Sequence, residues 1–177
     1  GLGAWKDAVG TSGSTANKRG LTKYGVMMLE EMMDLGMVID MDHFSQKALA
    51  QAMDITEKRT ARPDAKYPFV FSHVAFRDLA LDPSSTSEIK QTANESHKTA
   101  LDIARLKASG GMFGIGLVQG NVKTFSGTKV KNDSAGSSKS WAQAYQYAVS
   151  KMGVLGVGMG TDINGGPGSP GPRFGSF

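Results

Sequence analysis

Four short apolar runs stand out along the chain, and each follows an amphipathic segment. Because they are continuous, short and apolar, the runs are predicted to be buried strands: residues 37–40, 67–73, 112–118 and 154–162. In the segments before them, apolar residues recur at the spacing of a helix: residues 20–36, 45–58, 95–111 and 140–153. Thr22 and Ser45 are placed to cap the first two helices, and Gly36 to end the first.

The alternation of helices and strands predicts an α/β fold in which helices cover a sheet of parallel strands. Two architectures fit this order, a doubly wound sheet and part of a (β/α)8 TIM barrel. About four strand–helix units occupy the 177 residues, whereas a whole barrel needs roughly 250. We therefore expect residues 1–177 to form a single domain and, if the fold is a barrel, to be a fragment of a longer protein.

The composition is that of an ordinary globular protein, with 40% hydrophobic and 20% charged residues. The net charge of +4 comes from lysines and arginines scattered among acidic residues, so nucleic-acid binding is not expected. The sequence has no cysteine, which excludes disulfides and thiolate metal sites. No apolar stretch approaches the roughly 18–20 residues that span a membrane. A cytoplasmic and a periplasmic or secreted location both stay open.

Polar side chains gather where the predicted strands end. The first strand leads into Asp40, Asp42 and His43, the second ends at His73, and the fourth ends at Asp162. In a parallel sheet these ends share one edge, which is where α/β proteins bind ligands. Imidazole nitrogens and carboxylates are zinc ligands, and a bound metal lowers the pKa of water to about 7. The pattern therefore predicts a metal site, with His43, His73 and Asp162 as candidate ligands.

Each of these residues also has a plain structural interpretation. A single histidine at the end of a strand is more often a hydrogen-bonded structural residue than a ligand. Asp162 can cap the turn after its strand, and Asp40 or Asp42 can cap the next helix or orient His43 beside a metal. The combination favours metal binding, because three such residues fall on one edge. The third histidine, His97, falls in a predicted helix and is interpreted as a surface residue.

The glycine-rich segment at the fourth strand does not predict a phosphate-binding loop. Gly156, Gly158 and Gly160 alternate within the strand, whereas a dinucleotide fingerprint places GxGxxG between a strand and a helix. The GxxxxGK[ST] pattern of a P-loop is absent from the sequence. Alternating glycines indicate instead that something bulky approaches that side of the strand closely.

Three segments stand out as motifs: RGLTKYGVMMLEEMMDLGMVIDMDHFS, FVFSHVA and GVGMGTDINGG. Together they resemble motifs of the membrane (renal) dipeptidase family of metal-dependent amidohydrolases. RGLTKYGVMMLEEMMDLGMVIDMDHFS is similar to the segment that leads to a histidine at the end of the fifth barrel strand. FVFSHVA resembles the sixth-strand motif, and GVGMGTDINGG the eighth-strand motif. The loop GAWKDAVGTSGSTANKRGLT resembles the region before these motifs. The resemblance runs, with gaps, over nearly the whole chain and keeps the motifs in order.

The resemblance implies a (β/α)8 barrel with two zinc ions, of which this chain supplies strands five to eight. His43 and His73 would match the two imidazole ligands of one zinc ion. Asp162 would match the carboxylate that binds the other zinc ion and handles the proton, which makes it the implied catalytic residue. Substrates in the family are dipeptides and related amides, which a hydroxide held between the metals attacks.

The chain also departs from the family pattern. The family's HxD pair, its bridging glutamate and a further histidine would lie before residue 1, so we expect little activity from these 177 residues alone. Arg77 lies near the place of the arginine that holds the substrate carboxylate, but out of register with it. Arg173 is a second candidate for substrate binding. Asp42 stands where the dipeptidases usually have a small residue, and it adds negative charge beside the metal.

The leading hypothesis is a zinc-dependent, dipeptidase-like amidohydrolase that cleaves a peptide or amide bond. Two alternatives stay open. One is a non-catalytic α/β half-barrel, whose unpaired strand edges would favour a homo-oligomer or assembly with a missing N-terminal half. The other is an amidohydrolase that acts on another bond, such as a lactone or a phosphoester, because a fold does not dictate its substrate.

Overall fold

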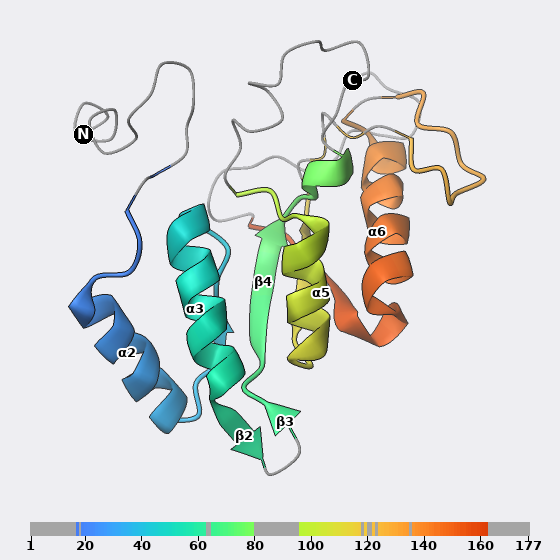
Figure 1. Cartoon of the computed structure of the whole chain (residues 1–177). Coiled ribbons are helices and arrows are strands. Elements are labelled where there is room, and N and C mark those ends of the chain that lie inside the picture. The colour runs from blue at the N-terminus through green and yellow to red at the C-terminus, as the bar shows by residue number, and fades with distance from the viewer. Residues whose placement is uncertain are drawn as a thin grey trace.

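The computed structural model gives the helices and strands of most of the chain (Figure 1). It describes residues 17, 19–62, 65–79, 96–117, 119, 122, 124–134 and 136–162. The helices are α2 (Lys23–Asp34), α3 (Gln46–Lys58), α5 (Ala100–Ala108) and α6 (Ser138–Met152), with short 3-10 helices at Arg77–Leu79 and Val154–Gly156. The strands are β1 (Ile39–Asp40), β4 (Phe69–Val74), β5 (Met112–Gly116) and β6 (Val157–Gly160), and a separate antiparallel pair is formed by β2 (Thr60–Arg62) and β3 (Ala65–Lys66).

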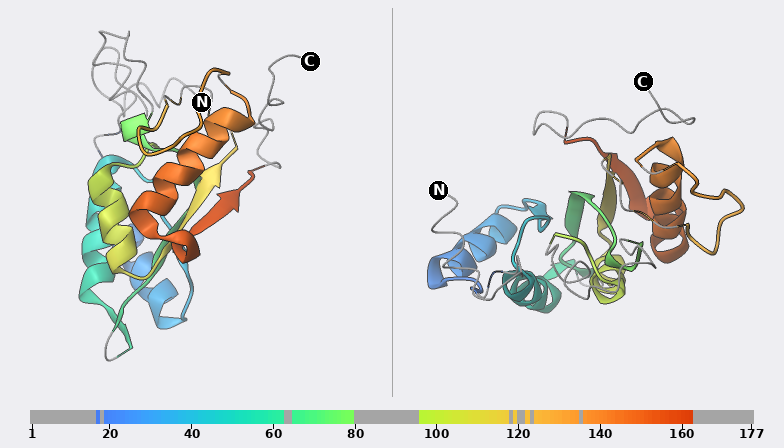
Figure 2. Two further views of the ribbon diagram at one scale, coloured as in Figure 1. Left: turned by 90° about the vertical axis from the view of Figure 1, so that its right-hand side faces the viewer. Right: turned by 90° about the horizontal axis from the view of Figure 1, so that it is seen from above.

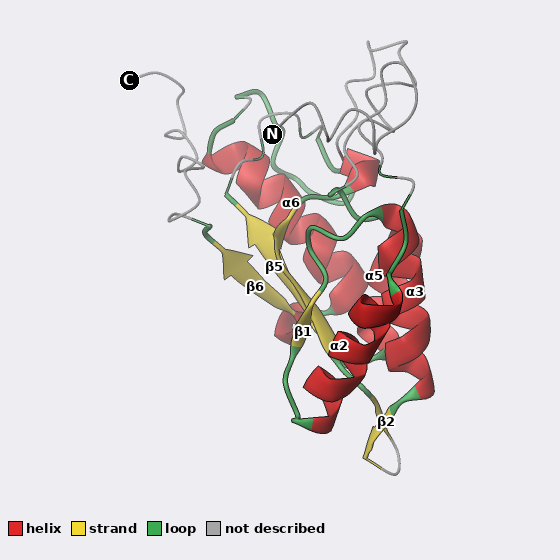
Figure 3. Ribbon diagram, turned by 90° about the vertical axis from the view of Figure 1, so that its left-hand side faces the viewer, coloured by secondary structure: helices red, strands yellow, loops and turns green. Residues whose placement is uncertain are grey.

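Strands β1, β4, β5 and β6 form one parallel sheet, in which their spatial order is also their order in the chain. The sheet is curved, and the four α-helices lie along its outer side (Figure 2, right). α6 packs against β5 and β6 (Figure 3). A doubly wound sheet would reverse its strand order and carry helices on both faces. The structure is therefore a partial TIM-barrel-like fold, and the predicted fold class is confirmed.

Side-chain caps determine where the helices begin. Thr22 and Ser45 cap α2 and α3 as predicted, since each hydroxyl accepts the N–H three residues further on. Thr99 caps α5 in a reciprocal capping box with Asp102. Because α5 begins just after Thr99, the prediction that its helix includes His97 was wrong.

The strands differ from their apolar runs in detail. The fourth predicted strand is shorter than expected, because residues Val154–Gly156 form a 3-10 turn after Gly153, whose φ is 84°. The pair of β2 and β3 was not predicted, since strands of three and two residues are too short to show an alternating pattern. The first predicted strand keeps only Ile39 and Asp40, and Met37 and Val38 before them are exposed rather than buried. β4 and β5 lie where the apolar runs predicted them.

The core between the sheet and its helices is rich in aromatic side chains. Phe69, Phe71, Phe76 and Phe113 are at most 1% exposed. The ring of Phe76 stacks on that of Phe113 with centroids 4.3 Å apart, and Phe71 meets Phe113 edge-on. Phe69 and Phe71 alternate along β4, which leaves the residues between them on the inner face of the curved sheet.

Glycines allow β4, β5 and β6 to approach one another closely where the strands end. A Cβ added to Gly114 or Gly160 would overlap the carbonyl oxygen of Ser72, and one added to Gly116 would lie 2.5 Å from that of His73. The Cβ on Gly160 would also lie 2.6 Å from the Cα of His73. The close approach predicted from the alternating glycines is therefore found at Gly160, and it concerns the strand that carries His73.

Gly160→Ala is expected to lower the free energy of unfolding by roughly 1–3 kcal/mol, because the backbone of β4 cannot move away from the new methyl group without losing its pairing. The matched control is Gly158→Ala on the same strand, where a Cβ would meet only the flexible end of Met112, at 3.1 Å. Urea unfolding of the two variants measures the difference. Equal losses at both positions would contradict this interpretation of the packing.

Candidate metal centre

The candidate site lies at the edge of the sheet where the parallel strands end. Asp42 and His43 occupy the turn after β1, His73 belongs to the last part of β4, and Asp162 follows β6. The pairing of β4 with β5 shifts register around His73, and such irregularities re-aim side chains at the rim of a sheet. The topology thus brings polar residues from three strand ends to one place.

The two histidines that the sequence singled out face each other. The Nε2 atoms of His43 and His73 are 2.7 Å apart, and their ring centroids are 4.8 Å apart. A carboxylate oxygen of Asp162 lies 3.8 Å from the Nε2 of His73. This distance is that of a hydrogen bond from one imidazole to the other. Two nitrogens that bind one tetrahedral zinc ion lie about 3.3 Å apart, so the rings would have to separate slightly to share a cation.

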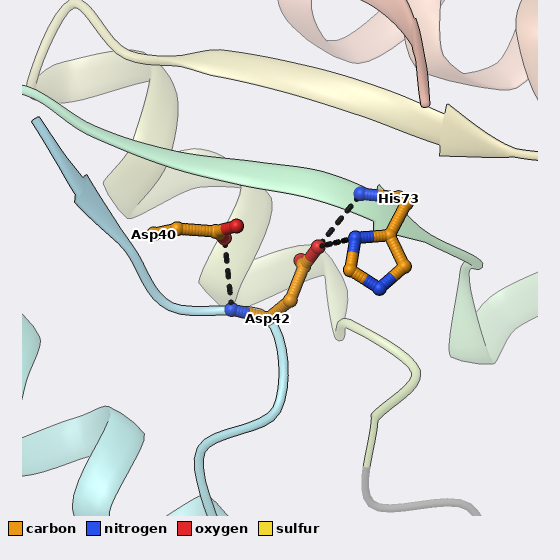
Figure 4. Close-up of side chains that lie close together, drawn as sticks. All are labelled: Asp40, Asp42 and His73. Atoms are coloured by element: carbon orange, nitrogen blue, oxygen red, sulfur yellow. Dashed lines mark hydrogen bonds and ion pairs between the residues drawn. The ribbon is translucent and has the colours of Figure 1, made fainter. Parts of the chain in front are cut away.

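Asp42 holds the other side of the His73 ring (Figure 4). This aspartate is only 2% exposed, and its Oδ2 atom accepts the backbone N–H of His73 at 2.6 Å. The same oxygen lies 2.9 Å from the Nδ1 atom of His73. A carboxylate at Nδ1 favours the tautomer with its proton there, which leaves the lone pair of Nε2 directed toward His43 and Asp162.

Ser72, which sequence reasoning missed, connects the two aspartates of the turn. Its hydroxyl oxygen lies 2.6 Å from Asp40, 2.8 Å from Asp42 and 2.7 Å from Nδ1 of His73. The hydroxyl has one proton and can donate it to only one carboxylate at a time. Asp40 in turn accepts the backbone N–H of Asp42 at 3.2 Å (Figure 4). Asp40 and Ser72 therefore support Asp42. The sequence places Ser72 at the end of a predicted strand, but it does not show the contacts of this serine with two aspartates.

Two groups of side chains at this edge have the chemistry of a metal site. In the first, Asp40, Asp42 and His73 offer ligand atoms that all lie within 4.8 Å of one another. The second is formed around Nε2 of His73 by His43 and Asp162. The Nδ1 side of the ring is already filled by hydrogen bonds, whereas its Nε2 side meets another imidazole and a carboxylate. The geometry therefore favours the Nε2 side, whose nitrogen and oxygen donors suit a zinc ion.

The buried Oδ1 atom of Asp42 agrees with a cation nearby. Among the residues that the structure describes, this atom has no hydrogen-bond partner. A buried carboxylate oxygen without a donor is costly, and a positive charge close to the carboxylate offsets that cost. This oxygen belongs to the carboxylate on the Nδ1 side of His73, so it bears on the group of Asp40, Asp42 and His73 and not on the Nε2 side. The imidazoles and carboxylates of both groups are donor types that fit a bound divalent metal.

A buried lysine, which the sequence analysis did not single out, lies beneath the turn. Lys98 is 1% exposed, and its ammonium group donates to the backbone carbonyl of Asp42 at 2.6 Å. Burial lowers the pKa of Lys98 to about 8, while the negative charge of Asp42 opposes that shift. A lysine beside a histidine in an amphipathic segment is typical of a surface, so the sequence held no signal for this position.

The substrate-binding candidates lie less centrally. Arg77 follows β4, and its Nη1 atom donates to the side-chain oxygen of Gln46 at 2.6 Å in the amide orientation that satisfies both groups. His97 is half-buried rather than a surface residue, which corrects the sequence interpretation. Burial lowers the pKa of His97 to about 4, and the positive charges of Arg77 and Lys98 contribute. Arg173 lies outside the described residues.

The fold and this cluster together define a class of protein: a barrel-type α/β protein with histidines and carboxylates gathered at the C-terminal ends of its strands. The model of one family, the membrane dipeptidases (peptidase family M19), matches residues 3–172. The chain therefore belongs to the membrane dipeptidase family, a family of metal-dependent peptidases, and the resemblance seen in its motifs is confirmed.

One curated relative and two solved structures are similar to this chain. An uncharacterized dipeptidase of Schizosaccharomyces pombe is 27% identical over 152 residues, which cover 86% of this chain and 30% of that protein. A metallopeptidase of Rhodobacter sphaeroides, solved with a phosphinate mimic of the dipeptide L-Ala-D-Ala, superposes with a TM-score of 0.61 at 19% identity, over 90% of this chain and 38% of that one. The probable dipeptidase PvdM of Pseudomonas aeruginosa gives a TM-score of 0.62 at 20% identity, over 85% of this chain and 44% of that one.

The match covers only part of each relative. The chain spans about a third of the length of the curated relative, and less than half of each of these two structures. Within the described part of the chain, no helix is long and apolar enough to cross a membrane.

The low pKa of His97 predicts a specific dependence of stability on pH. Its folded-state value of about 4 lies below the ordinary value of 6.5, so between these two pH values the unfolded chain binds more protons than the folded one. Stability from this group is complete above about pH 6.5 and is lost as the pH falls toward 4, by roughly 1–3 kcal/mol. Urea unfolding of the protein and of His97→Gln across this range measures the difference. Parallel pH profiles for the two proteins would contradict the prediction.

Proposed function

We propose that the protein is a metal-dependent dipeptidase in which His43 and His73 bind one zinc ion through their Nε2 atoms. The observation that supports this most strongly is the 2.7 Å approach of these two nitrogens, together with a carboxylate on the opposite side of one ring. Membership of the dipeptidase family supports the reaction class. The Rhodobacter sphaeroides structure, which holds a mimic of the dipeptide L-Ala-D-Ala, supports dipeptides as substrates.

Each residue of the centre has a proposed role. A zinc ion would polarise the scissile carbonyl and lower the pKa of water to about 7. Asp162, 3.8 Å from the Nε2 of His73 and partly exposed, would bind a second zinc ion and move a proton between water and the leaving amine. Asp42 would keep His73 in the tautomer that binds metal, and Asp40 would keep Asp42 in place.

Arg77 is the proposed contact for the carboxylate group of the substrate. Its guanidinium presents a planar set of donors that matches a carboxylate, and it lies just beyond the strand that carries His73. Because Gln46 holds this side chain, substrate would have to share or replace that contact. Arg173 is proposed as the second candidate for the same role.

The proposed function is tested with the full-length protein loaded with zinc and given a panel of substrates. Hydrolysis of dipeptides, with much weaker action on lactones and phosphoesters, is the expected outcome. If the protein hydrolyses only the lactone or the phosphoester, it is an amidohydrolase with a different substrate class, and the dipeptidase proposal is wrong. If the protein binds zinc but cleaves none of these substrates, the proposed function is wrong.

Replacement of either central histidine should abolish zinc binding at this site. His43→Ala and His73→Ala each remove one imidazole donor, and we expect at least a hundredfold loss of zinc affinity, measured by competition with a chelating dye. The chain has three histidines, so His97→Ala is a natural control that should keep wild-type affinity. Zinc binding that survives in both alanine variants would place the metal elsewhere.

Asp42→Asn should weaken zinc binding about 10–100-fold, since partners that orient metal-binding histidines have effects of this size. The amide keeps the shape of the side chain but no longer favours the proton on Nδ1 of His73. Nitrogen NMR of the imidazole should show the loss of a fixed tautomer in the zinc-free protein. The control is Asp34→Asn, which removes an exposed carboxylate paired with Arg59. Unchanged affinity and an unchanged tautomer would exclude this role for Asp42.

A further inference from the structure

We propose that Lys98 is a positioning residue that holds His43 against His73 and so sets the affinity of the metal site. The inference rests on the proposed function, in which these two histidines bind the ion. It concerns a side chain that does not touch the metal position and acts only through the backbone of the turn that carries His43.

The turn has little support from the sheet itself. β1 contains only Ile39 and Asp40, which pair with Phe69 and Val70 of β4. One further backbone hydrogen bond joins Met41 to β4, from its N–H to the carbonyl oxygen of Val70. Beyond that point, the turn has to be held in place by side chains if His43 is to stay close to β4.

The backbone of Lys98 is fixed to the continuation of the strand that carries His73. Its N–H donates to the carbonyl oxygen of Ala75 at 2.9 Å, and its own carbonyl oxygen accepts the N–H of Arg77 at 2.9 Å. A parallel bridge between Phe76 and Lys98 describes the same pairing. The backbone of Lys98 therefore has a fixed position relative to β4 and to His73.

From this fixed backbone, the side chain of Lys98 extends to the turn that carries His43. Its ammonium group donates to the carbonyl oxygen of Asp42 at 2.6 Å and lies 3.3 Å from that of Met41. It also lies over the ring of Phe71, 4.6 Å from its centroid. These carbonyl groups belong to the two residues immediately before His43, so the lysine fixes the position from which the imidazole projects.

Asp42 is thus held at two points, at its carboxylate by His73 and at its backbone carbonyl group by the ammonium group of Lys98. The carboxylate of Asp42 is bound to the backbone and ring of His73, while its carbonyl group is bound to Lys98. Removal of the ammonium group would leave two buried carbonyl groups without this donor, which is costly enough for the turn to open. His43 would then move away from His73, even though every metal-binding side chain is still present.

The test compares Lys98→Met, Lys98→Arg and the control Lys107→Met in the full-length protein. Lys107 also donates to a backbone carbonyl, that of Lys151, but at a site remote from the turn. Zinc affinity should fall at least tenfold in Lys98→Met, recover in part in Lys98→Arg, which keeps charge and donors, and stay unchanged in the control. In the zinc-free protein, nitrogen NMR should show the His43 imidazole of Lys98→Met moving to the signals of an unrestrained ring.

The outcomes separate this proposal from the proposed function. If the wild-type protein binds zinc and Lys98→Met keeps both its affinity and its His43 signals, the role of Lys98 is overturned and the metal site stands. If the wild-type protein binds no zinc, the proposed function fails, and the His43 signals still decide whether Lys98 positions the ring. Should Lys98→Met not fold, Lys98→Arg decides: weakening as large as that of His43→Ala would overturn the proposal.

Discussion

The arrangement of the candidate centre depends on the carboxylate of Asp42, which ties the end of β1 to the end of β4. The pairing of these two strands stops at Asp40 and Val70, so the sheet alone fixes His73, which belongs to β4, but not His43. Asp42 closes this gap by accepting both the backbone N–H and the ring of His73. Burial of a carboxylate is costly without donors, and Ser72 and the backbone N–H of His73 donate to its Oδ2 atom, whereas its Oδ1 atom has no hydrogen-bond partner among the described residues.

A second constraint is the close approach of the three strands that follow. Gly114, Gly116 and Gly160 lack the side-chain atoms that would keep β4, β5 and β6 apart. This close approach affects the candidate site, because Asp162 follows β6 and its Oδ2 atom lies 3.8 Å from the Nε2 atom of His73. Asp162 also has a positive φ of 46°, a conformation uncommon in residues other than glycine, although aspartate adopts it more readily than most. The glycines that allow the close packing and the carboxylate of the candidate metal site thus lie at the same strand ends.

The sequence was sufficient for the four strands of the parallel sheet, apart from their exact bounds, and for the residues that lie at their ends. Continuous apolar runs identify buried parallel strands, and in such a sheet the position after a strand determines the edge of the sheet on which a residue lies. Lys98 and Ser72 could not be found in this way. Their importance comes from pairing between segments distant in the chain, as between Phe76 and Lys98, and such contacts leave no periodic pattern. The placement of His97 failed for a different, local reason, since Thr99 and Asp102 form a capping box that starts the helix after it.

X-ray diffraction at the zinc absorption edge, from crystals of the full-length protein grown with zinc, tests the central claim most directly. We predict an anomalous peak for a zinc ion that is bound by the Nε2 atoms of both His43 and His73, with the carboxylate of Asp42 hydrogen-bonded to Nδ1 of His73. A zinc ion bound instead by Asp40 and Asp42, on the Nδ1 side of the His73 ring, would contradict this assignment. So would two imidazoles that remain hydrogen-bonded to each other with no metal between them.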